Sequence, residues 1–200
     1  TYDGWFKEST FTTPVTSIAK GTNPTLWLKT DKETGSGLII DSAEKWSEAT
    51  LNAASGTVYI VGDWELQPLY QSPPEKSPWL LKGDVVLDFS GFSGTFAGIS
   101  GNDFNSAVIG CVTLNEYTLT IKNLSLKDAV VNGVGITGGI ISYAEANAAR
   151  SAITFIDCDV ENCSVYSSST GVISCFVSQI NCVNLHAINC NIKDCTIRTP

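Results

Sequence analysis

Three carboxylates near the C-terminus are the strongest candidates for chemistry in this chain. Asp157, Asp159 and Glu161 are each separated by one residue, and alternate residues of a β-strand point to the same face. Carboxylates grouped on one face can bind calcium or act as a general acid and base. The three residues are therefore the candidate catalytic set, and calcium is the cofactor that such a set would use.

Three aromatic residues suggest a second kind of site. Trp64 precedes a proline-rich loop, and Tyr70 and Trp79 flank it. Tyrosine and tryptophan combine a large apolar ring with one polar group. If exposed, these rings form a platform for sugar rings, and we take them as the candidate ligand-binding residues. The alternative is that they pack the loop onto the body of the protein.

Other reactive residue types do not join a recognisable motif. The single histidine, His186, and Arg150 have no functional partner at a recurrent spacing. The sequence contains no nucleophile elbow and no phosphate-binding loop. Its seven cysteines form no C-x-x-C pair, which disfavours a zinc or redox motif. Outside the calcium alternative, we expect no metal and no cofactor.

The three carboxylates lie within a repeat with a period of 32 residues. Residues 139–142 (GIIS) return as residues 171–174 (GVIS), and residues 156–158 (IDC) return as residues 188–190 (INC). A weaker copy begins at Ala107 and continues after a two-residue indel. A match of this kind indicates one structural unit stacked on a copy of itself.

Within each unit the apolar residues alternate with polar ones, which is the period of a half-buried strand. The alternation shifts by one residue at Asn162, and again at the equivalent Asp128 and Asp194. Because Asn and Asp tolerate turn conformations, the chain is expected to bend there. Short strands separated by bends predict an all-β fold, a right-handed parallel β-helix. The residues expected to point inward are Leu124, Cys158, Val160, Cys190 and Ile192.

The outward positions of stacked units also align in columns. Lys127, Glu161 and Lys193 form one column whose charge alternates, and each such pair stabilises the stack by a few tenths to about 1 kcal/mol. The columns of two candidate carboxylates are polar rather than acidic: Asn123, Asp157 and Asn189 form one, and Ser125, Asp159 and Asn191 form the other. This pattern is typical of a solvated face, so the sequence favours a protein that is not an enzyme.

Both ends of the β-helix need cover, because an open end exposes unpaired backbone groups. At the N-terminal end, Asp41 and Glu44 have the spacing of a capping box, which predicts a short capping helix over residues 42–54. Its buried face would contain Ala43, Trp46, Ala49 and Ala53. Residues 1–37 are expected to be an N-terminal extension packed on the helix.

We expect the β-helix to occupy residues 38–200 and to continue beyond residue 200. The last unit ends close to Pro200, and no amphipathic segment follows to cover it. The alternative is self-association through the C-terminal coil. The chain starts at Thr1 without a signal-like segment, which indicates a processed mature chain or an excised segment.

Charge and hydropathy exclude some partners. The 20 acidic residues outnumber the 12 basic ones, giving a net charge of −8 and an isoelectric point near 4.5. Such a chain has no cationic surface for phosphates, so nucleic acid is a poor partner. The most apolar stretch, residues 129–144, is interrupted by Asn132 and several glycines. It is shorter than the roughly 20 apolar residues of a spanning helix, so we expect no membrane insertion.

Several segments together resemble a known superfamily. The segments are residues 42–46 followed by 56–60, residues 94–98, and the unit starts at residues 139–141 and 171–173. They look like exported parallel β-helix proteins of the pectin-lyase-like superfamily. The nearest resemblance is to bacterial and archaeal adhesin-like surface proteins with GLUG-type or chlamydial polymorphic-membrane-protein-type repeats.

This resemblance implies a secreted or cell-surface protein with an adhesion role. Its partner would be a host or environmental glycan, or a protein surface. The same superfamily contains pectate lyases and polygalacturonases. The resemblance therefore also implies an alternative, a polysaccharide lyase or glycoside hydrolase acting on an acidic polysaccharide.

Overall fold

A computed structural model describes residues 2–6, 27–30, 37–71, 78–100, 104–169 and 171–200. The chain divides into two compact units, Thr1–Ser36 and Gly37–Pro200. In the first unit, β1 (Tyr2–Phe6) and β2 (Trp27–Thr30) pair as antiparallel strands. Most of the expected N-terminal extension lies outside the described residues, and its packing on the helix stays a prediction.

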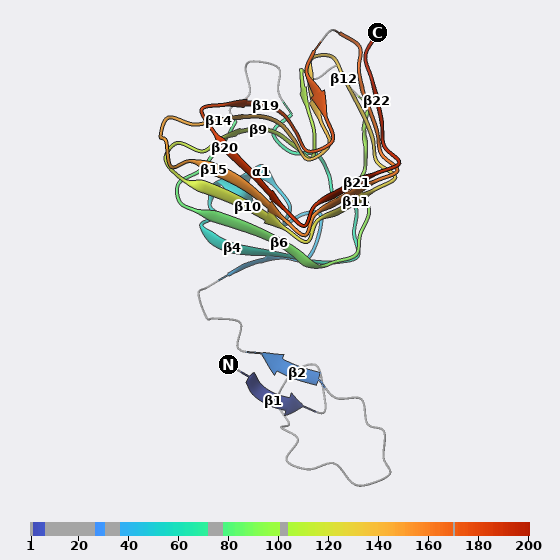
Figure 1. Ribbon diagram of the computed structural model, residues 1–200. Coiled ribbons are helices and arrows are strands. Elements are labelled where there is room, and N and C mark those ends of the chain that lie inside the picture. Colours follow the sequence, from blue (N-terminus) through green and yellow to red (C-terminus); the bar gives the residue numbers. More distant parts are fainter. Residues whose placement is uncertain (1, 7–26, 31–36, 72–77, 101–103, 170) are drawn as a thin grey trace. The chain divides into compact units, whose positions relative to one another are not determined.

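The second unit is an all-β parallel solenoid of about four turns, as the repeat predicts (Figure 1). Its strands stack in parallel sheets that surround a large apolar core, and a smaller apolar cluster contains Ile99, Val131 and Val165. The handedness of the coil stays a prediction.

The largest sheet runs in the order β3 (Leu38–Ile40), β4 (Gly56–Gly62), β6 (Val85–Phe92), β10 (Thr118–Lys122), β15 (Ala152–Ile156) and β20 (Asn184–Ile188). The next sheet along the chain contains β11 (Ser125–Lys127), β16 (Asp159–Glu161) and β21 (Asn191–Lys193). A further sheet contains β7 (Ile99–Ser100), β12 (Val130–Gly133), β17 (Ser164–Ser167) and β22 (Thr196–Arg198). The two remaining parallel sheets are β8 (Asn105–Ser106), β13 (Ile136–Gly138) and β18 (Ile173–Ser174), and β5 (Trp79–Leu80), β9 (Ile109–Thr113), β14 (Ile141–Glu145) and β19 (Val177–Asn181).

The register of the strands follows the repeat. Leu126 pairs with Val160, and Val160 pairs with Ile192. Leu124, Cys158 and Val160 are buried in the core, as the alternation predicts. Their equivalents Cys190 and Ile192 continue the same register, and Cys190 is half-buried and Ile192 is 54% exposed.

The coils bend at two rows of residues with left-handed backbone. Asp128, Asn162 and Asp194 have φ values of 54°, 53° and 52°, which confirms the bend predicted from the shift in alternation. A second row, expected to lie on a strand face, bends in the same way: its members are Asn123, Asp157 and Asn189, with φ values of 59°, 53° and 52°. Asn and Asp suit both rows because their short polar side chains tolerate this conformation.

The helix expected over residues 42–54 is not formed at that length. The helix α1 covers only Glu48–Asn52, because the side chain of Ser47 accepts a hydrogen bond from the Thr50 N–H and starts the helix there. Asp41, expected to be the N-cap, forms an ion pair with Lys45 at 2.7 Å instead.

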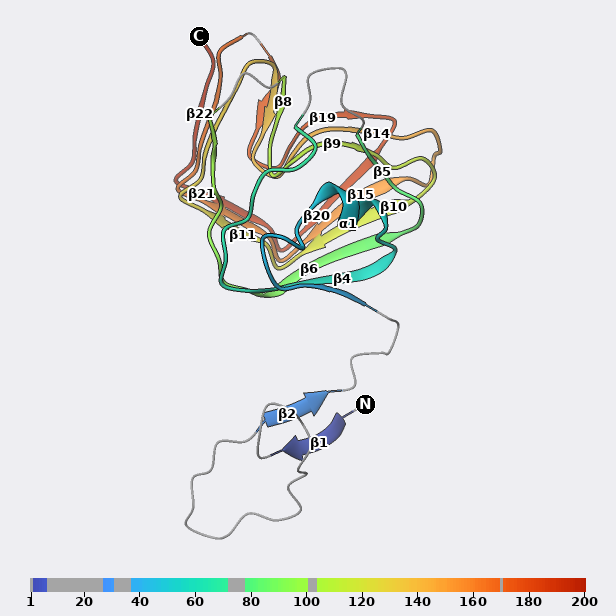
Figure 2. The same cartoon turned by 180° about the vertical axis from the view of Figure 1, so that it is seen from behind.

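The buried residues of this segment also differ from those predicted. Trp46 is buried as expected, and it donates from Nε1 to the Gln67 carbonyl at 2.7 Å. The other buried residues are Leu51 and Ala54, whereas Ala43, Ala49 and Ala53 are exposed. Figure 2 shows α1 within the ring of strands when the solenoid is seen from behind. Its role as an N-terminal cap stays a prediction.

No helix within the described part of the chain is long and apolar enough to span a membrane.

The buried thiols of the core give a first testable prediction. Cys158 and Cys175 are free and buried, and burial raises the pKa of Cys158 to about 11 and that of Cys175 to about 12. The thiolate is the reactive form, and two pKa units reduce its fraction about 100-fold. In the folded protein at pH 8, we expect iodoacetamide to modify the exposed Cys182 at least about 100-fold faster than Cys158.

Peptide mass spectrometry after timed alkylation measures these rates. The same chain in urea is the control, because there all the thiols should react at similar rates. Equal rates for Cys158 and Cys182 in the folded protein would show that Cys158 is not a core residue.

Candidate functional site

A groove opens where two neighbouring coils separate beside β11. Strand β6 continues to Phe92 and pairs with β4 as far as Gly62 and Phe92, with a register shift between Tyr59 and Val61 of β4. Strand β10 stops at Lys122, and the chain then bends at Asn123. β11 therefore leaves the direction of β6, and among the described residues it pairs with β16 alone.

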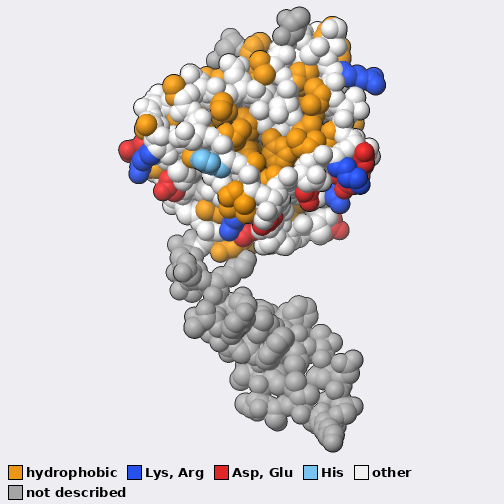
Figure 3. Space-filling model, viewed as in Figure 1, with side chains coloured by type: hydrophobic (Ala, Val, Ile, Leu, Met, Phe, Trp, Pro, Cys, Tyr) orange, Lys and Arg blue, Asp and Glu red, His pale blue; other side chains and the backbone are white. Residues whose placement is uncertain are grey.

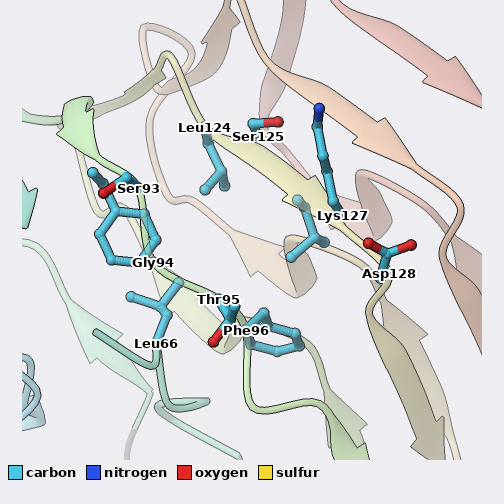
Figure 4. Close-up of a pocket in the computed structure, with 11 residues that line it drawn as sticks. Leu66, Ser93, Gly94, Thr95, Phe96, Leu124, Ser125, Lys127 and Asp128 are labelled. Carbon is cyan, nitrogen blue, oxygen red and sulfur yellow. The ribbon is translucent and has the colours of Figure 1, made fainter. Parts of the chain in front are cut away.

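The groove has a volume of about 530 Å³. Figure 4 shows its two sides facing each other, one formed by Leu66 with the end of β6 and the residues after it, and the other by β11 with its flanking residues. The first side contains Leu66, Phe92, Ser93, Gly94, Thr95 and Phe96, and the second contains Leu124, Ser125, Leu126, Lys127 and Asp128. We call this site the β11 groove.

The β11 groove has an apolar floor and a polar rim. Leu66, Leu124 and Leu126 are buried, and Phe92 and Phe96 are half-buried. The rim residues are exposed, and most carry a hydroxyl or a charge: Ser93, Thr95, Ser125, Lys127 and Asp128. Sites that bind small molecules commonly combine an apolar lining with a few placed polar groups.

The backbone of β11 adds polar groups to the groove. The Leu124 carbonyl accepts from the Asp159 N–H at 2.9 Å, and the Asp128 N–H donates to the Glu161 carbonyl at 3.1 Å. These groups face β16, and backbone groups of alternate strand residues face opposite sides. The N–H and C=O groups of Ser125 and Lys127 are therefore turned toward the groove.

Of the three candidate aromatic residues, only Trp64 lies near this groove. It packs edge-on against Phe92, with ring centroids 5.0 Å apart, and donates from Nε1 to the Val61 carbonyl at 2.8 Å. The hydrogen bond holds the Trp64 ring in place, and the ring contact supports Phe92 in the groove wall. Trp64 thus supports the wall and is not one of the lining residues.

Tyr70 and Trp79 do not form an exposed platform, because both are buried. Their rings stack with centroids 6.0 Å apart. Trp79 Nε1 donates to the Leu51 carbonyl at 3.0 Å, and the Tyr70 hydroxyl donates to the Glu48 carbonyl at 2.9 Å. Burial raises the pKa of Tyr70. The two rings join α1 to the solenoid, which agrees with the packing alternative considered for them.

The three candidate carboxylates do not converge on one point. Asp157 lies at a corner of the coil, while Asp159 and Glu161 belong to β16. Glu161 lies between two lysines, with Lys193 Nζ at 3.0 Å and Lys127 Nζ at 3.3 Å. Within the described ranges, no group of three His, Cys, Asp or Glu residues is arranged to hold a metal ion.

The charged side chains along this face form ion pairs and hydrogen bonds with their neighbours. Hydrogen bonds and ion pairs from Lys193 and Lys127 hold the pKa of Glu161 below its ordinary value. A catalytic general acid needs the opposite shift. The Asp128 carboxylate accepts a hydrogen bond from the Asn162 side chain. Lys127, Glu161 and Lys193, the column of alternating charge predicted from the sequence, are thus joined by ion pairs.

The remaining reactive residue types lie apart from the groove lining. His186 is exposed on β20, where it pairs with Thr154. Arg150 lies 3.6 Å from Glu116 and over the ring of Tyr117. Both residues occupy the surface, as expected.

No protein-family model matches this chain, and no curated protein or solved structure matches it either. The parallel solenoid agrees with the fold implied by the resemblance to pectin-lyase-like proteins, while membership of that superfamily stays a prediction.

Proposed function

We propose that this protein is a non-catalytic extracellular surface or adhesion module that binds a glycan in the β11 groove. The main support is the composition of the groove, an apolar and aromatic floor with a rim of hydroxyls and backbone groups. A sugar ring has an apolar face and a hydroxyl edge, which match these two parts. Half-buried Phe96 would contact the ring face, and Ser125 and Thr95 would contact its hydroxyls.

Catalysis is the less supported alternative, because the groove lining contains one acidic residue. Glycoside hydrolysis requires two carboxylates flanking the scissile bond, and Asp128 is the one acidic residue among the described residues that line the groove. Calcium-dependent cleavage requires several oxygen ligands around the ion. The lyase or hydrolase alternative would have to use Asp157, Asp159 and Glu161, of which Glu161 is engaged by two lysines.

The cell-surface location and the adhesin-like role rest on the resemblance of the sequence to exported β-helix proteins. The partner would be a host or environmental glycan, or a protein surface that carries one. The net charge of −8 disfavours a polyanionic ligand by repulsion. A neutral glycan is therefore the ligand class that we propose.

A glycan array with the whole chain tests this function. We expect binding to at least one neutral glycan, and we expect Phe96→Ala to raise the dissociation constant about tenfold, as loss of an aromatic anchor commonly does. Isothermal titration calorimetry with the best glycan measures this change. Phe104→Ala is the matched control, because Phe104 is exposed and does not line the groove.

Two outcomes would contradict the proposal. One is the absence of any glycan binding by the folded chain. The other is turnover of a polysaccharide, seen as new reducing ends or unsaturated uronates, that is lost in Asp159→Ala. The second outcome would favour the enzyme alternative.

A further inference from the structure

Strand β11 presents a backbone donor and a backbone acceptor to the β11 groove. The Leu124 carbonyl and the Asp128 N–H bond to β16, and the backbone groups of successive residues between them alternate in direction. The Ser125 carbonyl and the Lys127 N–H therefore lie on the groove side. Within the described part of the chain, β11 has no strand partner on that side.

This strand edge is too short to suit a bound peptide strand. β11 contains three residues, Ser125–Lys127, and the left-handed residues Asn123 and Asp128 bend the chain at its two ends. A peptide that adds a strand to a sheet gains its affinity from a series of main-chain hydrogen bonds, and an edge of this length offers few of them. A ligand with a single amide group needs only one donor on this side of the groove.

The opposite side of the groove offers a hydroxyl group. Thr95 is exposed and lines this side, and its carbonyl accepts from the Leu66 N–H at 2.7 Å, which fixes its backbone. Figure 4 shows Thr95 and Lys127 on opposite sides of the groove. The N–H and C=O of a trans amide point in opposite directions. One amide between the two sides can therefore donate to one side and accept from the other.

The groove favours an uncharged group with an apolar end. Leu124 and Leu126 are buried in its floor, and Figure 4 shows Leu124 pointing into the space between the two sides. The cationic residue of the lining, Lys127, lies 3.3 Å from Glu161. Figure 3 shows basic and acidic side chains grouped at the edge of the solenoid where Figure 1 places β11 and β21. Because these charges pair with one another, they attract an ionic ligand only weakly.

We propose that the β11 groove recognises the acetamido group of an N-acetylated amino sugar. The acetamido carbonyl accepts from the Lys127 N–H, and its methyl group packs on Leu124 and Leu126. The acetamido N–H donates to the Thr95 hydroxyl, which can still donate to a neighbouring sugar hydroxyl. A plain sugar hydroxyl at this position has no methyl group to cover the apolar floor. This inference rests on the glycan binding proposed above and names the substituent that selects the glycan.

Two trisaccharides with the same β-1,4 linkage test the inference with the complete chain. Triacetylchitotriose carries an acetamido group wherever cellotriose carries the equivalent hydroxyl. We expect isothermal titration calorimetry to give the chitotriose a dissociation constant at least about tenfold lower, as one further hydrogen bond and one buried methyl group would produce.

A change in the backbone tests the role of the Lys127 N–H. Lys127→Pro removes this donor, and proline is tolerated on a strand edge whose N–H is not used in the ladder. The preference for the chitotriose should then fall below about threefold. Lys127→Ala is the matched control, because it also loses the ion pair with Glu161 but keeps the N–H, and it should keep the preference. Thermal melting verifies that both variants are folded.

The possible outcomes separate this inference from the proposed function. Equal affinity of the two trisaccharides for the wild-type protein would overturn the inference whether or not the proline variant folds, and a neutral glycan found on the array would leave the proposed function standing. A preference that survives in folded Lys127→Pro would also overturn the inference. Tighter binding of N-acetyl-trialanine amide than of the chitotriose would overturn it by identifying a peptide site. Absence of any glycan binding by the folded chain would overturn both proposals.

Discussion

Val160→Asp is expected to prevent the solenoid from folding. Val160 is fully buried on β16, between Leu126 and Ile192 of the neighbouring coils. An unpaired carboxylate at that position costs several kcal/mol, which is a large part of the 5–15 kcal/mol that stabilises a typical domain. Far-ultraviolet circular dichroism across a urea titration should show no folded baseline, or a free energy of unfolding lowered by more than about 4 kcal/mol.

The adjacent residue provides the matched control for this experiment. Asp159 is exposed on the same strand, so Asp159→Ala should change the free energy of unfolding by no more than about 0.5 kcal/mol. Comparing the two variants tests whether neighbouring residues of β16 point inward and outward. Similar stability losses in the two variants would contradict the alternation.

Trp79→Ala should give the second large effect. The Trp79 side chain is 0% exposed, stacks on Tyr70 and donates a hydrogen bond to the Leu51 carbonyl. Replacing a buried tryptophan by alanine typically costs about 3–5 kcal/mol, because it leaves a cavity as well as losing buried apolar area. Urea unfolding of the wild type and the variant measures the difference.

An aromatic residue on the surface is the control for Trp79. Tyr166 lies on β17 and is 37% exposed, so Tyr166→Ala should cost less than about 1 kcal/mol. If Trp79→Ala kept full stability but lost sugar binding, the ring would be a ligand platform and its placement in the core would be wrong.

The solenoid could be predicted from the sequence because each coil repeats the same local pattern. Cys158 and Val160 alternate with polar residues in one coil, and Cys190 and Ile192 repeat the pattern in the next, which indicates the register. Ile156 was predicted to belong to the same alternation, but the bend at Asp157 separates it from Cys158, and it is only half-buried. The identity of the bend residues added a second signal. Asp128, Asn162 and Asp194 all have the left-handed backbone that this residue type tolerates.

The extent of the helix could not be predicted from spacing alone. Ala43, Ala49 and Ala53 have a helical spacing, but alanine contributes little burial and all three are exposed. Ser47 provides a competing N-cap, which starts the helix six residues after Asp41. The large residues Trp46 and Leu51 then determine which side of the segment is buried.

The β11 groove was missed because it arises from a difference between coils rather than from the repeat. In the later coils, Asn123 and Asp157 occupy the corner after the long strand. The register of Lys122 with Asp88 places Phe89 at the equivalent position of the earlier coil. Phenylalanine does not favour a left-handed bend, and β6 continues past this position to Phe92 with a register shift against β4. Phe89, at the position where later coils have Asn or Asp, was therefore the feature of the sequence that could have indicated the groove.

Sequence position also gave no indication of which aromatic rings are buried. Tyr70 and Trp79 border a proline-rich loop, where exposed and packed rings have the same local sequence pattern. Their burial results from contacts with α1, which is 18 or more residues away in the chain.

Methyl–methyl contacts across three coils test the parallel stacking in register most directly. Stacked strands lie about 4.8 Å apart, and Val160 pairs with Leu126 on one side and with Ile192 on the other. In a sample with labelled Leu, Val and Ile methyl groups, we predict nuclear Overhauser cross-peaks between Leu126 and Val160 and between Val160 and Ile192. The pair Leu126 and Ile192, two strand spacings apart, should give none. Absence of both predicted cross-peaks in the folded protein would contradict the solenoid.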